Sequence, residues 1–493
     1  MRRKYAPADG GEEPALDTAS FQFVCFGLAV ALISNFSRSR AWRSTVLMLS
    51  SLLFLGLLAQ RPILFLPLAG FLLLGYAGLK AIERGWSKRM VWPVLLVILV
   101  YIWLKKYTFL PEGSFLRFPY FTLGLSYIFF RVLHLQIEAA DTRGKNPVGI
   151  GAYLLYTLNF TTFISGPIQR YDEFARDQLA AEPVALGWSV IGLQMERIIR
   201  GFFKVNVAAA LLLALHQDAL EQITHVGPLP LKLSAAFRLS VLYPIYLYCN
   251  FSGYIDIVIA LARLMRLRLP ENFDRPFSAS SFIEFWNRWH MTLSNWLKTY
   301  VYNSLLLTLM RRIPSPDAAP FLGVFCFFVT FFLIGVWHGR TSEFIFFGVL
   351  QGGGVSINKL WQLGLTRTMG RKGYRALAGN PLYAALGRGL TFAWFAFTLN
   401  WFWAGWSQIR AVFSAIGTGR CLGVWLAVWL AATLVLAIWE LLRTLLLMPK
   451  IASGPLLLSR YARVVYATAL GFVALVMVLL LNQPAPEIVY KAF

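Results

Sequence analysis

The chain has 493 residues, of which 58% are hydrophobic and 16% aromatic, and its mean hydropathy is +0.59. Soluble proteins use about 45–50% apolar residues, so this composition excludes a set of soluble domains and predicts an integral membrane protein. Apolar runs of about 20 residues, enough to cross a bilayer, recur from residue 21 almost to the C-terminus. We expect a flexible tail at 1–20 and a single membrane-embedded domain at 21–493.

The formal net charge of +23 could indicate a nucleic-acid partner. Its basic residues, however, fall in short connectors between apolar runs, which is typical of topology signals in membrane proteins. The aromatic residues lie inside the apolar runs rather than in a basic groove. We therefore expect a lipid bilayer, and no nucleic acid, as a partner. The clusters that we place on the cytoplasmic side are Arg38, Arg40 and Arg43, then Arg84, Lys88 and Arg89, then Lys450, Arg460 and Arg463.

The first apolar spans are predicted at about 21–36, 45–59, 62–82 and 91–104. A helix that follows carries Arg131, His134 and Glu138 on one face, because residues seven apart share a helix face. Charged groups at membrane depth must face protein, water or each other, although a solvated pair at an interfacial helix end is an equal alternative. After this helix, Gly166 and Pro167 predict a helix break.

The middle of the chain mixes basic and apolar residues. We predict a basic helix at 195–204 near the cytoplasmic interface, and solvated surface positions for His216 and His225. The apolar run 239–264 contains Asp256, whose carboxylate needs a partner at that depth. Pro270 and Pro276 predict an extended connector. Later spans are expected at 320–336, 343–362, 388–405, 422–445 and 462–481, with a basic loop at 366–375.

The segment 282–300 contains three tryptophans and a histidine. On a helix its aromatic and aliphatic side chains fall on one face and its polar side chains on the other. Such a helix lies at the membrane interface or lines a cavity in the protein. His290 lies at the border of the two faces, near Asn287 and Ser294. An interfacial anchor with an incidental histidine remains an alternative.

His338 ends the apolar run FFVTFFLIGVWHG, between Trp337 and Gly339. A neutral imidazole can take a proton from a hydroxyl and return it, and the glycine leaves room for a substrate. A helix-end cap is the alternative. The chain contains no G-x-S-x-G elbow, Walker A motif, GxGxxG or HExxH. The absence of a nucleophile elbow favours direct transfer to an acceptor hydroxyl over a covalent acyl-enzyme. The four cysteines have no paired spacing and, without HExxH, no metal site is predicted.

Two motifs, FWNRWHMTLSNWLKTYVY at 285–302 and GVWHG at 335–339, resemble the membrane-bound O-acyltransferase (MBOAT) family. The resemblance is to the bacterial branch that contains the teichoic acid D-alanyltransferase and the alginate O-acetylation protein. Supporting matches at 123–138, 164–174 and 251–277 extend it over a core of about 120–360. Relatives usually carry arginine and aspartate where this chain has Lys298 and Thr299, so an ion pair there is absent.

The resemblance implies an all-α polytopic fold, with a ring of roughly 11–13 transmembrane helices and interfacial helices around a central tunnel. It implies that His338 is the general base, and that His290, with Asn287, positions the acyl group or polarises its carbonyl. Further candidate substrate-binding residues are Trp289, Ser294, Trp337 and Asp256. No permanently bound cofactor is expected, since the acyl donor would be a thioester, either acetyl-CoA or a phosphopantetheine carrier protein.

The implied function is transfer of an acetyl or D-alanyl group from that cytoplasmic donor across the membrane. The acceptor would be a hydroxyl of a cell-envelope polysaccharide or of a periplasmic or extracellular partner protein. The implied location is the bacterial plasma (inner) membrane, with multiple passes. The alternative from another class is a polytopic exporter or flippase, in which Arg131 and Asp256 would line a path.

Overall fold

The computed structural model describes residues 20–58, 61–85, 91–118, 120, 122–141, 147–225, 227–451, 454–455 and 458–481. Almost all regular structure in these residues is helical; the exception is an antiparallel pair of two-residue strands, β1 (Lys450–Ile451) and β2 (Gly454–Pro455). The all-α prediction is confirmed. The predicted tail lies, except for Ser20, outside the described residues.

The chain divides into two compact units. Unit 1 comprises Met1–Val207, Asn250–Pro270 and Leu470–Phe493, and unit 2 comprises Ala208–Cys249 and Glu271–Ala469. Each unit is described by itself, and the single membrane domain stays a prediction. Two helices and one π-helical turn have residues in both units: α12 (Leu229–Leu264), α22 (Arg460–Leu481) and η4 (Lys204–Ala209).

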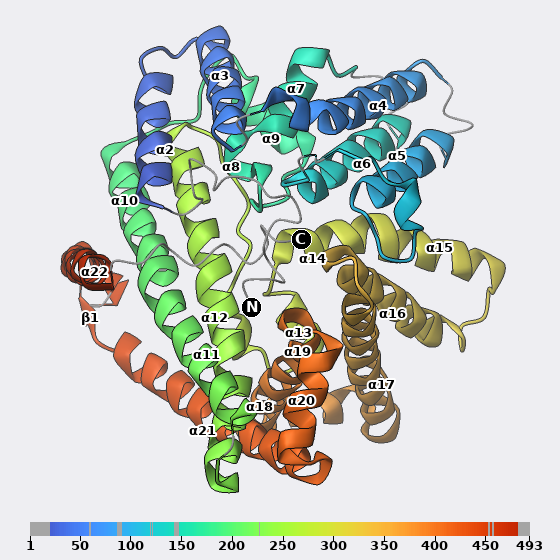
Figure 1. Cartoon of the computed structure of the whole chain (residues 1–493), viewed down its shortest axis with the longest axis vertical. Coiled ribbons are helices and arrows are strands. Elements are labelled where there is room, and N and C mark those ends of the chain that lie inside the picture. Colours follow the sequence, from blue (N-terminus) through green and yellow to red (C-terminus); the bar gives the residue numbers. More distant parts are fainter. Residues whose placement is uncertain are drawn as a thin grey trace. The chain divides into compact units, whose positions relative to one another are not determined.

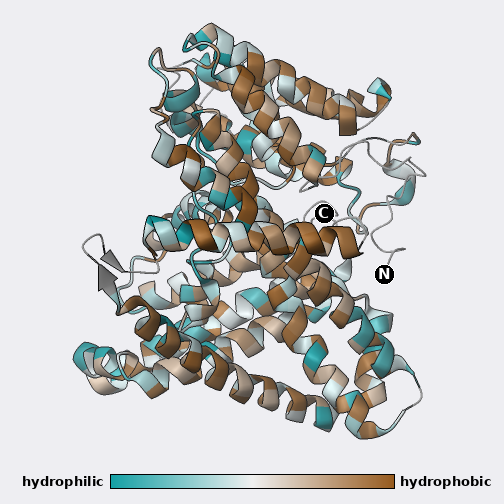
Figure 2. Cartoon of the chain, turned by 90° about the vertical axis from the view of Figure 1, so that its left-hand side faces the viewer, coloured by the Kyte–Doolittle hydropathy of each residue, from teal (hydrophilic) through white to brown (hydrophobic). Residues whose placement is uncertain are grey.

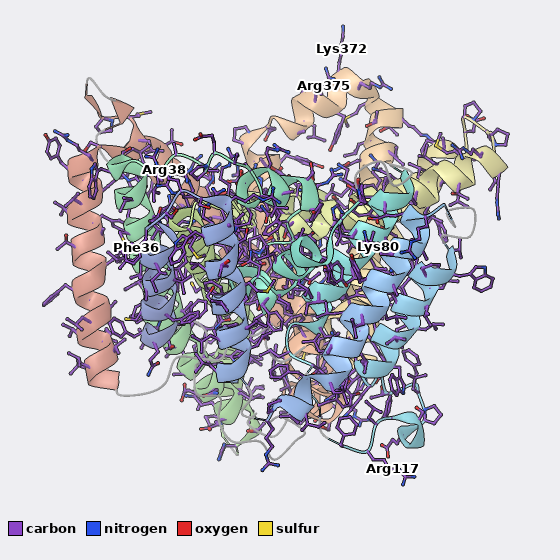
Figure 3. The ribbon with its side chains drawn as sticks, turned by 90° about the horizontal axis from the view of Figure 1, so that it is seen from above. Phe36, Arg38, Lys80, Arg117, Lys372 and Arg375 are labelled. Carbon is purple, nitrogen blue, oxygen red and sulfur yellow. The ribbon has the colours of Figure 1, made fainter. Side chains whose placement is uncertain are left out.

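Unit 1 is built largely from the helices of the N-terminal half. Within it α4, α5 and α6 pack against one another (Figure 1). In Figure 3, Arg38 and Lys80 lie toward one end of these helices and Arg117 toward the other. Its elements are α2 (Phe21–Ser34), α3 (Arg40–Leu58), η1 (Pro62–Phe65), α4 (Leu66–Glu83), α5 (Val91–Leu104), η3 (Glu112–Ser114), α6 (Leu125–Asp141), α7 (Ile150–Leu158), α8 (Phe160–Phe163), α9 (Tyr171–Gln178) and α10 (Trp188–Phe203).

Unit 2 contains both candidate catalytic histidines. Its most extensive helix pairings are α16 with α17 and α18 with α21. Its elements are α11 (Ala210–Thr224), η5 (Pro276–Ser278), α13 (Phe282–Trp286), α14 (Met291–Leu297), the π-helical η6 (Lys298–Tyr302), α15 (Asn303–Arg312), α16 (Ala319–His338), α17 (Ser342–Ala378), α18 (Pro381–Thr398), α19 (Asn400–Trp403), α20 (Trp406–Ile416) and α21 (Thr418–Leu447).

Eight helical stretches among the described residues are long and apolar enough to cross a membrane. Two shorter apolar helices, Phe21–Ser34 and Val91–Leu104, add to them. Hydrophobic residues accordingly run along the helices in Figure 2. A multi-pass membrane protein is confirmed, whereas the expected number of 11–13 spans and the central tunnel stay predictions.

The basic segment 195–204 is helical, as part of α10 and the first residue of η4, and its place near the cytoplasmic interface stays a prediction. Two other local predictions are wrong. His216 is fully buried, because its ring packs between Tyr243 and Trp403. The expected loop at 366–375 continues α17 and departs from helical geometry only at Gly370, where φ is 72°. Lys372 and Arg375 project beyond that point (Figure 3).

Four polar residues of α6, Ser126, Arg131, His134 and Gln136, are buried in unit 1. The Arg131 guanidinium donates to the backbone carbonyls of Tyr156, Thr157 and Thr162. Its hydrogen-bonding capacity is therefore met inside the protein, as burial of a charge requires. The solvated pair with Glu138 is consequently wrong; the Glu138 carboxylate lies 2.8 Å from Arg170 instead. The helix break at 166–167 is confirmed, since α8 ends at Phe163 and α9 begins at Tyr171.

Candidate active site

The tryptophan-rich segment is not the single amphipathic helix that its periodicity predicts. Helix α13 ends at Trp286 and α14 begins at Met291, and between them His290 adopts a left-handed backbone with φ 45° and ψ 49°. The physical reason is a tertiary contact, in which the extended segment 272–274 pairs with this turn. The amide of Asp274 donates to Arg288, and the amide of Met291 donates to Asn272.

Asn272 fixes the His290 ring. Its side-chain oxygen lies 3.2 Å from His290 Nδ1 and accepts from both the amide and the hydroxyl of Thr292, at 3.1 and 2.8 Å. A backbone N–H can only donate, so the Asn272 atom in this cluster is the oxygen. His290 Nδ1 must therefore carry the proton, which places the lone pair of a neutral ring on Nε2.

Burial keeps His290 neutral. The residue is fully buried, and desolvation lowers the pKa of its imidazole to about 3, because a charged ring loses its hydration there. At neutral pH the ring is therefore uncharged. It can accept a hydrogen bond at Nε2, whereas polarising a carbonyl would require a donor at that atom.

His338 is the last residue of α16 and is 2% exposed. Its imidazole packs edge-on against Phe402 of α19, with ring centroids 5.2 Å apart, and against Phe347 of α17. The GVWHG motif also explains how α16 approaches α17. A Cβ at Gly335 would collide with the backbone of Gly348, so only glycine permits this contact.

The two histidines flank one indole. The ring centroid of Trp337 is 6.2 Å from that of His290 and 4.8 Å from that of His338. Residues 48 positions apart in sequence thus contact the same side chain in unit 2. The structure therefore brings Trp337 and both histidines together, and their roles in catalysis stay predictions.

The remaining candidates occupy different surroundings. Trp289 is buried in an aromatic cluster with Phe273, Phe285 and Phe395. Asn287 is exposed at the end of α13. The Ser294 hydroxyl makes only a long bond of 3.4 Å to the Trp289 carbonyl. Their assignment as substrate-binding residues stays a prediction.

Asp256 lies in unit 1, where its carboxylate has the cationic partners that its depth in an apolar run predicts. Its carboxylate is 2.9 Å from both Arg197 Nε and Lys204 Nζ, and 3.4 Å from Arg200 Nη2. Close packing between Gly201 and Gly253 brings α10 near α12, since a Cβ at either glycine would meet the carbonyl of the other. The carboxylate thus has a structural task, and its substrate role stays a prediction.

Sequence analysis did not single out Asn272, although it lies within the PENFDRPF connector. We expect Asn272→Ala to lower kcat/KM for the acceptor by about 10–100-fold, the loss seen when metal-bound histidines lose their orienting partner. Steady-state kinetics on the purified variant would check this. Asn295→Ala, at an exposed position of α14, is the control. Unchanged kcat/KM for the acceptor in a folded Asn272→Ala protein would contradict the positioning role.

The sequence model of the MBOAT, membrane-bound O-acyltransferase family, matches residues 47–398. The chain belongs to the membrane-bound O-acyltransferase family. Asn272, His290 and His338 all lie inside the matched region.

Several curated members of the family are similar to this chain. A teichoic acid D-alanyltransferase of Streptococcus thermophilus is 31% identical over 283 residues, which cover 55% of this chain and 65% of the relative. A probable alginate O-acetylase of Pseudomonas aeruginosa is 29% identical over 245 residues, covering 48% and 42%. A peptidoglycan O-acetyltransferase of Helicobacter pylori is 30% identical over 210 residues, covering 42% and 37%. The matches thus span about two fifths to two thirds of these MBOAT proteins.

Proposed function

We propose that this MBOAT protein is an O-acyltransferase of the bacterial plasma membrane. It transfers an acyl group from a cytoplasmic thioester to a hydroxyl of a cell-envelope polysaccharide, or of a partner protein that completes the transfer. The observation that carries the proposal is the pair of buried histidines around Trp337. Family membership supports it, because the relatives named above act on teichoic acid, alginate or peptidoglycan.

In the proposed reaction, His338 takes the proton of the acceptor hydroxyl as its oxygen attacks the thioester carbonyl. The new C–O bond forms and the C–S bond breaks. The thiolate leaving group then receives the proton from the His338 imidazolium, which restores the neutral ring. No metal, nucleotide or covalent acyl-enzyme is needed to balance these steps.

His290 has a role limited by its tautomer. Because Nδ1 is held by Asn272, Nε2 offers a lone pair and suits a hydrogen bond from a hydroxyl of the acceptor other than the reacting one. We therefore assign His290 to orientation of the acceptor rather than to polarisation of the acyl carbonyl. Substitution of His290 would accordingly raise KM for the acceptor more than KM for the donor.

The exporter alternative is not favoured by the intramembrane charges. Arg131 donates to three backbone carbonyls, and Asp256 is held by three cations. Both groups are engaged by the protein itself, so their burial is explained without a transport path.

Labelling distinguishes the acyl groups, since relatives of both kinds are similar to this chain. Cells that express the chain would be fed radiolabelled acetate or D-alanine, and label released from the envelope polymer by mild alkali would be counted. We expect one of the two labels to depend on the chain and to be lost with His338→Ala. If neither label depends on the chain, the acetyl and D-alanyl assignments are both wrong.

A further inference from the structure

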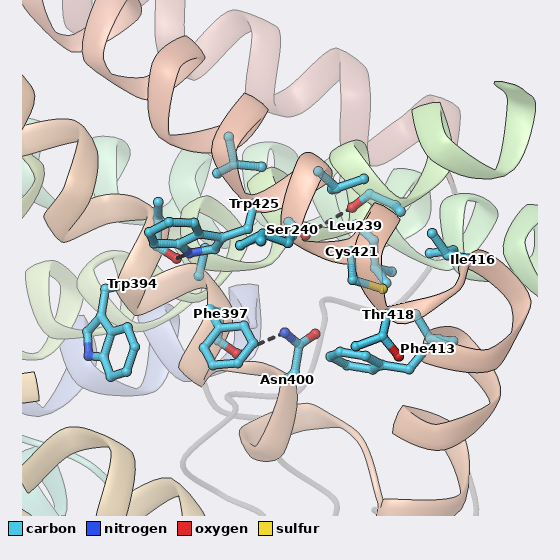
Figure 4. Close-up of a pocket in the computed structure, with 17 residues that line it drawn as sticks. Leu239, Ser240, Trp394, Phe397, Asn400, Phe413, Ile416, Thr418, Cys421 and Trp425 are labelled. Atoms are coloured by element: carbon cyan, nitrogen blue, oxygen red, sulfur yellow. Dashed lines mark hydrogen bonds between the residues drawn. The ribbon is translucent and has the colours of Figure 1, made fainter. Parts of the chain in front are cut away.

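A pocket of about 390 Å³ lies in unit 2 among α12, α18, α19, α20 and α21 (Figure 4). Its walls are mostly aliphatic, with aromatic rings from Trp394 and Phe397 of α18, Phe413 of α20 and Trp425 of α21. Ligand pockets in proteins fall in this size range and are mostly apolar. The proposed acyl transfer assigns no role to it. We propose that it binds an acyl chain of a membrane phospholipid.

Three polar side chains of the pocket are already hydrogen-bonded within the protein. Ser240 donates to the Ala236 carbonyl at 2.9 Å, and Asn400 Nδ2 donates to the Phe397 carbonyl at 2.8 Å. The indole of Trp425 donates to the Ala393 carbonyl at 3.1 Å. The buried indole N–H of Trp394 has no hydrogen-bond partner among the described residues and offers one further donor. A sugar or nucleotide would lose the hydration of many polar groups here and could recover few hydrogen bonds from so apolar a lining. An alkyl chain has no such penalty.

The position of α21 gives hydrocarbon access to the pocket. This helix is a candidate span, and it packs against α18 on one face while Leu422, Leu426 and Leu430 are exposed on another. Leu422 lines the pocket and is 60% exposed, whereas Ala393 and Val428 close the pocket at the buried core. The pocket therefore leads from the lipid-facing side of α21 inward. A lipid chain can enter it by exchanging one apolar environment for another.

Occupancy of the pocket would support the short helix α19. Asn400, the first residue of α19, lines the pocket, and Phe402, two residues on, packs against His338. Trp403 packs against His216. An empty pocket would leave its lining without contacts on one side. The acyl chain would thus pack against α19, the helix whose Phe402 contacts the His338 ring.

The test measures bound lipid and does not rely on acyl transfer. The full chain would be purified in detergent, washed extensively, and its retained lipids extracted and quantified by mass spectrometry. We expect the wild-type chain to retain phospholipid, and the pocket-filling variant Ser240→Phe to lose most of it. Leu430→Phe is the matched control, because Leu430 is 62% exposed on α21 and does not line the pocket.

A second variant keeps the test decisive if Ser240→Phe fails to fold. Cys421→Phe adds the same ring from a half-buried position at α21 and should cause the same loss. Equal phospholipid in the wild-type chain and both pocket variants would overturn the proposal. So would retention of a polyprenyl lipid in place of phospholipid. Neither outcome would affect the proposed acyl transfer, which is measured separately.

Discussion

Substitution of His338 by alanine is expected to lower acyl transfer by about 10²–10⁴-fold, which is what a positioned general base supplies. The imidazole is 2% exposed and sits at the end of α16, so alanine removes the proton acceptor without exposing a charge. Transfer would be measured with purified protein, labelled thioester donor and acceptor, at matched protein concentration. His338→Gln, which keeps more of the side-chain volume, should be equally inactive if proton transfer is the reason.

The matched control is His225→Ala. His225 is exposed and lies just after the end of α11, so its loss should leave transfer near the wild-type rate. Folding of each variant would be verified by size-exclusion chromatography. If a folded His338→Ala protein retains wild-type transfer, His338 is not the general base, and the proposed mechanism fails.

Substitution of Asp256 by asparagine is expected to have the largest effect on stability. The Asp256 side chain is 9% exposed and faces Arg197, Arg200 and Lys204. The variant leaves three cations without their carboxylate, and breaking a buried ion pair costs about 3–5 kcal/mol of unfolding free energy. The thermal midpoint in detergent, followed by tryptophan fluorescence, should fall clearly below that of the wild-type chain.

Asp218→Asn is the control for this prediction. Asp218 also pairs with an arginine, Arg238, at 3.1 Å, but its side chain is 51% exposed, and exposed pairs contribute about 0–1 kcal/mol. Its midpoint should move little. If Asp256→Asn keeps the wild-type midpoint and instead raises KM for a substrate, Asp256 binds substrate and is not a structural counterion.

Much of the fold can be predicted from sequence because lipid imposes a simple rule. Every spanning segment must be apolar over about 20 residues. Its backbone N–H and C=O groups must hydrogen-bond to one another, which a helix achieves. The ends of α5, at 91 and 104, agree with the predicted span to the residue. Prediction fails where burial depends on a partner far away in sequence. His216 resembles a surface residue until Tyr243 and Trp403 enclose its ring.

The tryptophan-rich segment shows the same limit at the candidate site. Helical periodicity describes each half of it correctly, but pairing with 272–274 interrupts the helix at His290. No local pattern indicates that interruption, because its energy comes from hydrogen bonds to a different segment. The tautomer of His290 also depends on this contact, because the Asn272 oxygen fixes the Nδ1 proton. Asn272 is 18 residues away in sequence.

By itself, the sequence determined that this protein is an all-α, multi-pass membrane protein and indicated its family, since hydropathy and the two histidine motifs are local properties. It also selected His290 and His338. Only the tertiary structure decided that both rings flank Trp337, that Asn272 fixes the His290 proton and that three cations hold Asp256. These features require residues from separate segments to meet, and one-dimensional periodicity carries no information about such meetings.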